Sequence, residues 1–276
     1  MPTTIELEAI AHQIKTARDQ GLPLTQITSQ HAGFDSNAAY AVADLVHTMR
    51  MAEGVRAVGR KIGFTNPAMW AQYGVSAPVW AYVYDTTVTY LADTSNAPAT
   101  CSLRNFVNPK IEPEIIFHFR SAPPPEGDTA AVLACIDWVA HGFEMVQSPY
   151  PDWKFQAADA IAVGGLHARL LVGKRKPVDT LGADLQEALA AFTLALSCDG
   201  QLLETGKGAN VMGHPLAAVK HLMQVLASQS PHQPLQANEL VTTGTVTSAY
   251  SVQAGQTWQT ALVGIALPGL SVVFTQ

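Results

Sequence analysis

Residues 111–117 read Ile-Glu-Pro-Glu-Ile-Ile-Phe, an apolar segment that carries two acids. In an extended segment alternate side chains share a face, so Glu112 and Glu114 are expected to project the same way with Cα atoms roughly 6.6 Å apart. Two carboxylates this close repel each other unless a positive charge lies between them. A hard divalent cation such as Mg²⁺ is a natural partner, because it prefers oxygen ligands. The alternative interpretation is two acids on the solvent face of a sheet.

A third acid follows about thirty residues later in another strand-like run. Glu144 lies within Val-Ala-His-Gly-Phe-Glu-Met-Val at 139–146. Three carboxylates from two strands would leave positions on the ion for a chelating substrate, which is the arrangement of a Lewis-acid catalyst. The nearby His118 and His141 are not expected to be ligands, although His118 shares the strand parity of Glu112 and Glu114. His118 lies about 13 Å beyond Glu114 along an ideal strand, and His141 has the opposite parity to Glu144.

A lysine between glycines is a second candidate for chemistry. Residues 59–66 read Gly-Arg-Lys-Ile-Gly-Phe-Thr-Asn. Glycines let the backbone approach a ligand closely, and the Lys61 ammonium can bind a carboxylate or enolate oxygen. A plain surface turn is the alternative. The glycine-bearing segment at 206–210 lacks the ending of a phosphate-binding loop, and no G-x-S-x-G nucleophile motif is present, so neither a nucleotide site nor a serine hydrolase is indicated.

Outward from the acidic segment the chain reads as α+β and rich in strands. Helical patterns cover about 129–135, 183–191 and 215–228, and Pro268-Gly269 is expected to turn a closing hairpin. Strand-length apolar runs, separated by Gly, Pro and Asp turns, are found at 79–83, 115–119, 138–145, 194–198, 240–243, 246–252, 261–267 and 270–274.

The first fifty-odd residues read as helices. Thr3 and Glu6 have the spacing of a capping box, and a second helix is expected to start after Ser36 and to end at about Gly54. We therefore expect a helical N-terminal subdomain at 1–58 and a β-rich catalytic domain at 59–276. The helices are expected to act as scaffold.

Composition sets the class of protein. The chain has 276 residues, of which 48% are hydrophobic and 14% charged, with a formal net charge of −6, so a large core is expected and capture of nucleic acid or an anionic membrane is not. No signal peptide and no apolar run of about 20 residues is present. Three scattered cysteines, Cys101, Cys135 and Cys198, fit a reducing compartment. A cytoplasmic location is expected.

Taken in order, five segments resemble the fumarylacetoacetate hydrolase superfamily, and within it the branch of 2-keto-4-pentenoate hydratases and 4-oxalocrotonate decarboxylases. They are GRKIGFTN at 59–66, YGVSAP at 73–78, IEPEIIF at 111–117, HGFEMVQS at 141–148 and KGANVMGHPLAAVKHLMQVL at 207–226. The resemblance implies a mixed, rolled sheet, bound Mg²⁺ or Mn²⁺, a homo-oligomer, and 2-oxo or 2-hydroxydienoic acid substrates from the catabolism of aromatic compounds. It also implies Glu112, Glu114 and Glu144 as metal ligands and Lys61 as a substrate-binding and catalytic residue.

The chain departs from the branch pattern in the shell around these residues. Val79-Trp80 stands where an acid is usual, Gln147 and Pro149 replace an Asp and an Arg, and 164–167 reads Gly-Gly-Leu-His in place of a serine-bearing stretch. His167 stands at the position of a family serine, and we hypothesise that it is a proton donor, with a structural role as the alternative. Trp80 and Lys154 are expected to contact the substrate.

The ordered set predicts a metal-dependent lyase, with hydration of 2-hydroxypenta-2,4-dienoate as the leading reaction. The rivals are a decarboxylase of a 2-oxo-dioate, with Lys154, Arg104 or Arg169 binding the second carboxylate, and an acylpyruvate C–C hydrolase. A non-catalytic partner subunit is the alternative outside the enzymes.

Overall fold

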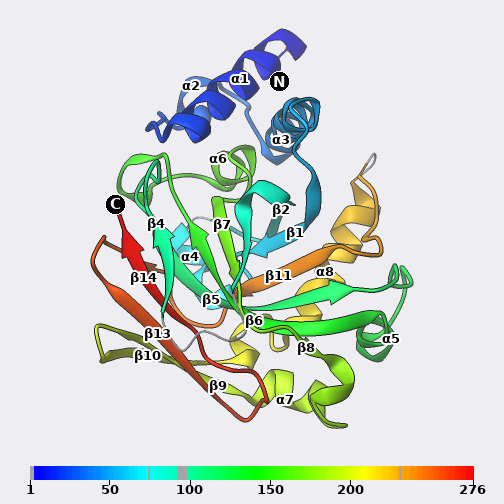
Figure 1. Cartoon of the computed structure of the whole chain (residues 1–276). Helices are drawn as coiled ribbons and strands as arrows, with labels where there is room; N and C mark the ends of the chain where they lie inside the picture. Colours follow the sequence, from blue (N-terminus) through cyan, green and yellow to red (C-terminus); the bar gives the residue numbers. More distant parts are fainter. Residues whose placement is uncertain (1–2, 74, 92–97, 230–231) are drawn as a thin grey trace.

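A computed structural model describes residues 3–73, 75–91, 98–229 and 232–276. Three helices come from the first fifty-two residues, and the others are inserted between strands (Figure 1). The α-helices are α1 (Thr4–Gln20), α2 (Ile27–Gln30), α3 (Ser36–Ala52), α4 (Trp70–Tyr73), α5 (Thr129–Ala134), α6 (Ala157–Ala162), α7 (Leu185–Ala191) and α8 (Pro215–Ser228).

The strands form two mixed sheets, as the α+β prediction requires. The larger runs in the order β2-β1-β11-β5-β6-β7-β3, with β12 beside β5 and β8 beside β6, and the smaller in the order β10-β9-β13-β14-β4. The larger sheet contains β1 (Ala57–Gly63), β2 (Val79–Tyr84), β3 (Val88–Tyr90), β5 (Lys110–Phe119), β6 (Ile136–Val146), β7 (His167–Val172), β8 (Lys176–Pro177), β11 (Leu240–Thr245) and β12 (Tyr250–Ser251). The smaller contains β4 (Ala99–Ser102), β9 (Thr193–Cys198), β10 (Gln201–Lys207), β13 (Thr257–Val263) and β14 (Ser271–Thr275).

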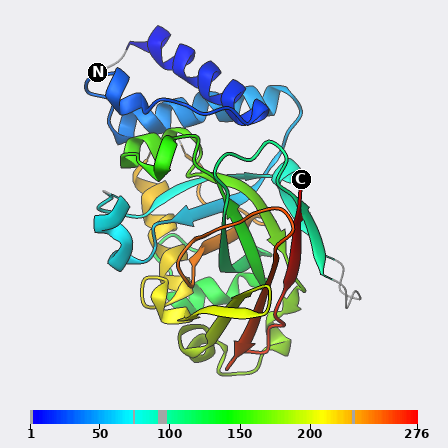
Figure 2. The same ribbon diagram turned by 90° about the vertical axis from the view of Figure 1, so that its left-hand side faces the viewer.

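The N-terminal helices cover one end of the molecule. In both views α1, α2 and α3 lie above the strands, with α6 between them and the larger sheet (Figures 1 and 2). The main hydrophobic core combines buried side chains of β5 and β6 with those of α8 and the smaller sheet. The central strands β5 and β6, which carry the predicted metal ligands, therefore lie between apolar layers.

The predicted capping box of α1 is confirmed. The Thr3 hydroxyl accepts a hydrogen bond from the Glu6 amide, and the Glu6 carboxylate accepts one from the Thr3 amide. The apolar cluster of these helices is continuous with later residues, since Ile14 and Val42 share it with Ile161. The division at residue 58 stays a prediction.

Most expected elements are present, and two strand predictions need correction. The run at 246–252 is wrong except at β12, because the chain bends after β11, where the Thr245 hydroxyl donates to the Thr247 carbonyl and accepts from the Thr247 amide. The run at 261–267 ends early at Val263, where pairing with β9 stops. The closing hairpin is confirmed as the antiparallel pair β13–β14, with Pro268-Gly269 in its connection.

Membrane crossing by a helix is not supported. Among the residues that the structure describes, no helix combines the length and the apolar character needed to span a bilayer.

Candidate metal centre

Glu112, Glu114 and Glu144 converge at the centre of the larger sheet. Strands β5 and β6 are antiparallel, and their register places Glu112 directly opposite Glu144. Each of the three residues offers a carboxylate oxygen within 4.8 Å of the others. Glu114 and Glu144 are fully buried and Glu112 is partly buried. An uncompensated cluster of this kind is costly in an apolar interior, so its oxygens are arranged for a positive partner.

A bulge in β11 partly satisfies Glu114. The pairing of β11 with β5 shifts register between Thr242 and Thr245, and bulges of this kind redirect groups near sites. As a result the Gly244 amide donates to Glu114 Oε2 at 2.9 Å, and the Thr242 hydroxyl donates to the same oxygen. Within the described residues the other oxygen, Oε1, is buried without a hydrogen-bond partner. This free oxygen is available to a cation.

Lys61 lies beside the carboxylates, and it belongs to strand β1, not to a surface turn. Its ammonium is buried, 3.2 Å from Glu144 Oε2, and it donates to the carbonyl of Gly165 at 2.9 Å. Burial disfavours its charged form, but the three carboxylates outweigh burial and raise the pKa of Lys61 above its ordinary value. Lys61 therefore stays protonated.

His167 contacts Glu144 and lies outside the main cavity. Its ring Nδ1 is 2.7 Å from Glu144 Oε1, and its Nε2 is 2.9 Å from the Thr87 hydroxyl. The side chain is 1% exposed, and burial lowers the pKa of His167. A neutral ring bound at both nitrogens is placed to support the Glu144 carboxylate, and donation of a proton to the substrate stays a prediction.

Charge is distributed unequally among the three acids. Burial, with repulsion from Glu144, raises the pKa of Glu112 to about 7. Burial and the two neighbouring carboxylates raise the pKa of Glu114 well above its ordinary value. Burial acts the same way on Glu144, but Lys61 and His167 outweigh it and lower the pKa of Glu144. Glu144 is therefore stabilised as an anion, whereas the charged forms of Glu112 and Glu114 need a further positive charge nearby.

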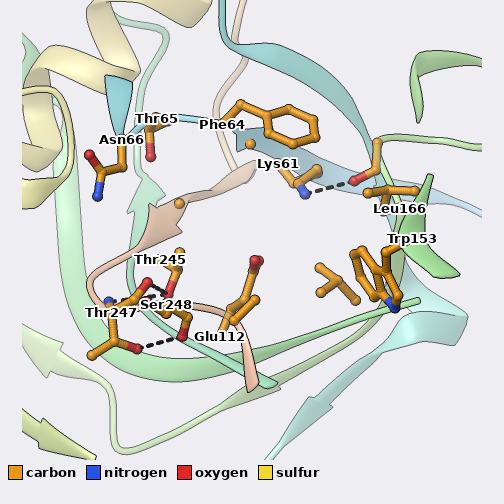
Figure 3. Close-up of a pocket in the computed structure, with 15 residues that line it drawn as sticks. Lys61, Phe64, Thr65, Asn66, Glu112, Trp153, Leu166, Thr245, Thr247 and Ser248 are labelled. Atoms are coloured by element: carbon orange, nitrogen blue, oxygen red, sulfur yellow. Dashed lines mark hydrogen bonds between the residues drawn. The ribbon is translucent and has the colours of Figure 1, made fainter. Parts of the chain in front are cut away.

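A cavity lies between Lys61 and Glu112 (Figure 3). It encloses about 600 Å³, including space open to solvent. Figure 3 shows Trp153 and Leu166 on one side and the hydroxyl-bearing loop of Thr245, Thr247 and Ser248 on the other. The described lining residues are Lys61, Gly63, Phe64, Thr65, Asn66, Glu112, Val146, Trp153, Gly165, Leu166, Gly244, Thr245, Thr247, Ser248 and Ala249.

Three bulky apolar residues of this lining have a left-handed backbone. Phe64, Trp153 and Leu166 have φ of 57°, 57° and 64°. Such angles are rare for large side chains and cost of order 1–3 kcal/mol each, and they gather at functional sites. The backbone on the apolar side of the cavity is therefore strained.

The structure does not bring Trp80 or Lys154 to the cavity. Trp80 lies on the other face of the β1–β2 pair, where it stacks with Tyr40 at 5.6 Å between ring centroids. Lys154 is an exposed side chain whose ammonium is 3.5 Å from Asp152. Neither residue lines the cavity, because strand parity and the turn at 151–153 direct them away from it.

Arg104 and Arg169, the other cations considered for a second carboxylate, are also absent from the described lining. The Arg169 guanidinium lies 5.8 Å from the Phe106 ring centroid. His118 and His141 lie away from the carboxylates: His118 binds Asp137 at 2.7 Å, and the ring of His141 lies between the Glu114 carbonyl and the Thr260 hydroxyl. Burial lowers the pKa of His141 to about 4.

Sequence reasoning missed the hydroxyl-bearing loop after β11. Residues 242–248 read Thr-Thr-Gly-Thr-Val-Thr-Ser. The sequence predicts strands at 240–243 and 246–252 and assigns no role to the hydroxyls of this segment. A glycine inside a polar-rich central strand indicates a bulge or a close approach. Here Gly244 has φ of 96°, and a Cβ on it would lie 1.9 Å from the Thr65 hydroxyl.

No family model matches the chain. Two relatives of known activity align with nearly all of it. A 4-oxalocrotonate decarboxylase of Pseudomonas putida is 29% identical over 90% of this chain and 89% of its own length. A 2-keto-4-pentenoate hydratase of Burkholderia vietnamiensis is 29% identical over 94% of each chain.

Solved structures show the same fold. The 4-oxalocrotonate decarboxylase of Pseudomonas putida G7, complexed with magnesium and adipate, matches with a TM-score of 0.88 and 25% identity over 99% of both chains. Fumarylpyruvate hydrolase of Pseudomonas aeruginosa, in complex with Mn²⁺ and pyruvate, matches with a TM-score of 0.56 and 16% identity over 80% of this chain and 89% of its own. The predicted rolled, mixed-sheet fold is confirmed.

Proposed function

The chain belongs to the fumarylacetoacetate hydrolase superfamily, in the branch of 2-keto-4-pentenoate hydratases and 4-oxalocrotonate decarboxylases, and from this we propose that it is a divalent-metal-dependent lyase of 2-oxo and 2-hydroxydienoic acids. We propose hydration of a 2-hydroxypenta-2,4-dienoate type of substrate as its reaction. The single observation that carries the choice of a metal enzyme is the convergence of three glutamates on one point beside Lys61.

Glu112, Glu114 and Glu144 would hold the ion. The fit rests on the unpartnered Oε1 of Glu114 and on a donor set made only of oxygens, which suits a hard cation. We propose Mg²⁺ or Mn²⁺, the ions named for two structural neighbours. When bound, the ion supplies a Lewis acid that stabilises negative charge on the 2-oxo oxygen of the substrate.

Lys61 would bind and orient the anionic end of the substrate. Its ammonium is held by Glu144 and the Gly165 carbonyl, so it is preorganised and pays little ordering cost when a carboxylate arrives. Water is partly excluded there, since Lys61 is 3% exposed. An electrostatic contact in such a site is worth more than in bulk solvent.

The cavity favours a substrate with an uncharged tail. Among the described residues that line it, Lys61 is the one with a positive charge, and the carboxylates already engage it. A second carboxylate on the substrate would enter beside Trp153 and Leu166 without a cation in the lining, which is costly for a charged group. A monoacid dienoate fits this wall, and hydration is therefore preferred over decarboxylation of a dioate.

The decarboxylase stays the second candidate because of Lys110. Lys110 is on the same face of β5 as Glu112, and its ammonium lies 4.0 Å from the centroid of the Trp153 ring. Trp153 lines the cavity, so a shift of this indole would bring a cation to the tail of the substrate.

A substrate pair tests the proposal. We expect the metal-loaded protein to consume 2-hydroxypenta-2,4-dienoate, which is measured as a loss of ultraviolet absorbance. We expect it to release little CO₂ from 4-oxalocrotonate. Faster CO₂ release would favour the decarboxylase, and cleavage of an acylpyruvate to two acids would favour the C–C hydrolase. Tight binding of a 2-oxo acid without conversion of any of these would favour a non-catalytic partner subunit.

We further propose a homo-oligomer, as the family resemblance implies, and a cytoplasmic location, which the three scattered cysteines fit. The described surface of the smaller sheet exposes Leu202 and Val263, at 58% and 70%, which is compatible with subunit contact. The mass in solution, measured by light scattering, tests this.

A further inference from the structure

A turn at 164–167 separates the metal centre from the N-terminal helices. On one side the Gly165 carbonyl accepts from Lys61 Nζ at 2.9 Å. On the other side the His167 carbonyl accepts from Arg18 Nη2 of helix α1 at 2.9 Å. Gly164, Gly165 and Leu166 have φ of 73°, 62° and 64°. Three consecutive left-handed residues need surrounding contacts to hold them.

The side chain of His167 links this turn to Glu144 through a hydrogen bond. An ionised carboxylate only accepts, so His167 Nδ1 carries the hydrogen that is shared with Glu144 Oε1 at 2.7 Å. The other ring nitrogen lies 2.9 Å from the Thr87 hydroxyl, whose single hydrogen is shared between this nitrogen and the Tyr84 carbonyl at 3.0 Å. With both nitrogens bound and the ring buried, the direction of the Glu144 carboxylate depends on where the turn holds His167.

Arg18 directs its guanidinium at the same turn. A Cβ on Gly164 would lie 2.5 Å from Arg18 Nη1, so the guanidinium packs directly on this glycine. In the described part of the chain no carboxylate lies within ion-pair distance of Arg18, whereas its neighbour Arg50 is 2.6 Å from Asp19. The charge-assisted hydrogen bond of Arg18 is therefore committed to the His167 carbonyl, 149 positions away in the chain.

We propose that Arg18 and His167 are positioning residues for Glu144, so that helix α1 is part of the metal centre and not only scaffold. The inference rests on the proposed metal-binding role of Glu144. Residues that hold a ligating carboxylate in place typically change metal affinity by about 10–100-fold when they are removed. Arg18 acts through the backbone of the turn, and His167 acts through its ring.

The test is the dissociation constant for Mn²⁺, measured by electron paramagnetic resonance or calorimetry on the full chain without substrate. We expect Arg18→Gln to weaken Mn²⁺ binding about tenfold and His167→Leu by more than that. His167→Asn keeps an N–H donor near the position of Nδ1 and is expected to restore most of the affinity. Arg50→Gln removes a neighbouring helix-to-helix ion pair and is expected to bind Mn²⁺ like the unchanged protein.

Failure of the proposed function and failure of the positioning role would give different results. If the unchanged protein binds no Mn²⁺, the proposed function fails. If it binds Mn²⁺ and both Arg18→Gln and His167→Leu keep its affinity, the positioning role is overturned. Thermal unfolding of each variant controls for loss of fold. If Arg18→Gln does not fold, the comparison of His167→Asn with His167→Leu still decides, because equal affinity of these two would overturn the role of the ring.

Discussion

Glu112 and Glu144 lie directly opposite each other on two adjacent antiparallel strands, with a third carboxylate, that of Glu114, beside them. Like charges in directly opposed positions destabilise a sheet. The arrangement persists here because Lys61 neutralises one acid and burial raises the pKa of the other two, which disfavours their charged forms. A bound cation should therefore stabilise the protein, because it reduces the repulsion among the three carboxylates.

Removing the charge of Glu112 should raise the stability of the metal-free protein and abolish its stabilisation by metal. We expect Glu112→Gln, without metal at about pH 8, to be about 1 kcal/mol more stable than the unchanged protein, or roughly 2–4 °C in Tm, because one repulsive charge is gone. The rise in Tm on adding Mn²⁺ should disappear. Differential scanning fluorimetry measures both, and Glu187→Gln on the exposed face of α7 is the matched control. A Glu112→Gln protein that still gains stability from Mn²⁺ would contradict the ligand assignment.

Metal affinity should rise with pH. The pKa of Glu112 is about 7 and that of Glu114 is raised, so both carboxyls hold protons at lower pH and a cation must displace them. In the metal-free fold, the stability linked to these raised pKa values is present below their unfolded values near 4.5 and is lost as pH rises toward 7. The Tm difference between loaded and metal-free protein should therefore widen from about pH 5.5 to about pH 8. A difference that stays constant would refute this.

Lys61 is expected to be indispensable to the charge balance. In Lys61→Met, Glu144 loses its buried counter-charge, which typically costs about 3–5 kcal/mol. Added metal should restore part of this stability, while turnover of a 2-oxo acid falls by at least about a hundredfold, because a preorganised charge is lost. Chemical denaturation with and without Mn²⁺ measures the first effect, and steady-state kinetics the second. Turnover within a few-fold of normal would remove Lys61 from the mechanism.

Gly165 is expected to tolerate no side chain. A Cβ there would lie 3.0 Å from Lys61 Cδ and 3.3 Å from the Ala81 Cβ, at a φ of 62°. Gly165→Ala should lose about 1–3 kcal/mol of stability and also weaken metal binding through Lys61 and the turn. Gly182→Ala is the matched control, because φ is 92° and a Cβ would meet nothing within 4 Å. Equal losses in the two variants would mean that backbone strain alone explains the effect.

Local sequence signals predicted much of the scaffold. The capping box at Thr3 and Glu6 and the helix at 215–228 depend on neighbours in the chain, and both are as expected. The shared face of Glu112 and Glu114 follows from strand alternation alone. The residue pattern also singled out Glu144 and Lys61, the resemblance implied their roles, and the structure places both beside these two acids.

What could not be predicted depends on contacts distant in sequence. Trp80 was expected at the substrate, but the register of β2 against β1 turns its ring to the opposite face from Lys61. Arg18 was assigned to scaffold, since its hydrogen bond to the His167 carbonyl has no local signature. The bulge at Gly244 depends on the pairing of β11 with β5. Each of these follows from how strands and helices are assembled.

The most direct test of the metal centre is the anomalous scattering of crystals grown with Mn²⁺. The predicted result is one strong peak among Glu112, Glu114 and Glu144, with carboxylate oxygens at about 2 Å, a distance typical of small divalent cations. Crystals in which the three carboxylates point apart, or in which Mn²⁺ binds elsewhere, would contradict the account.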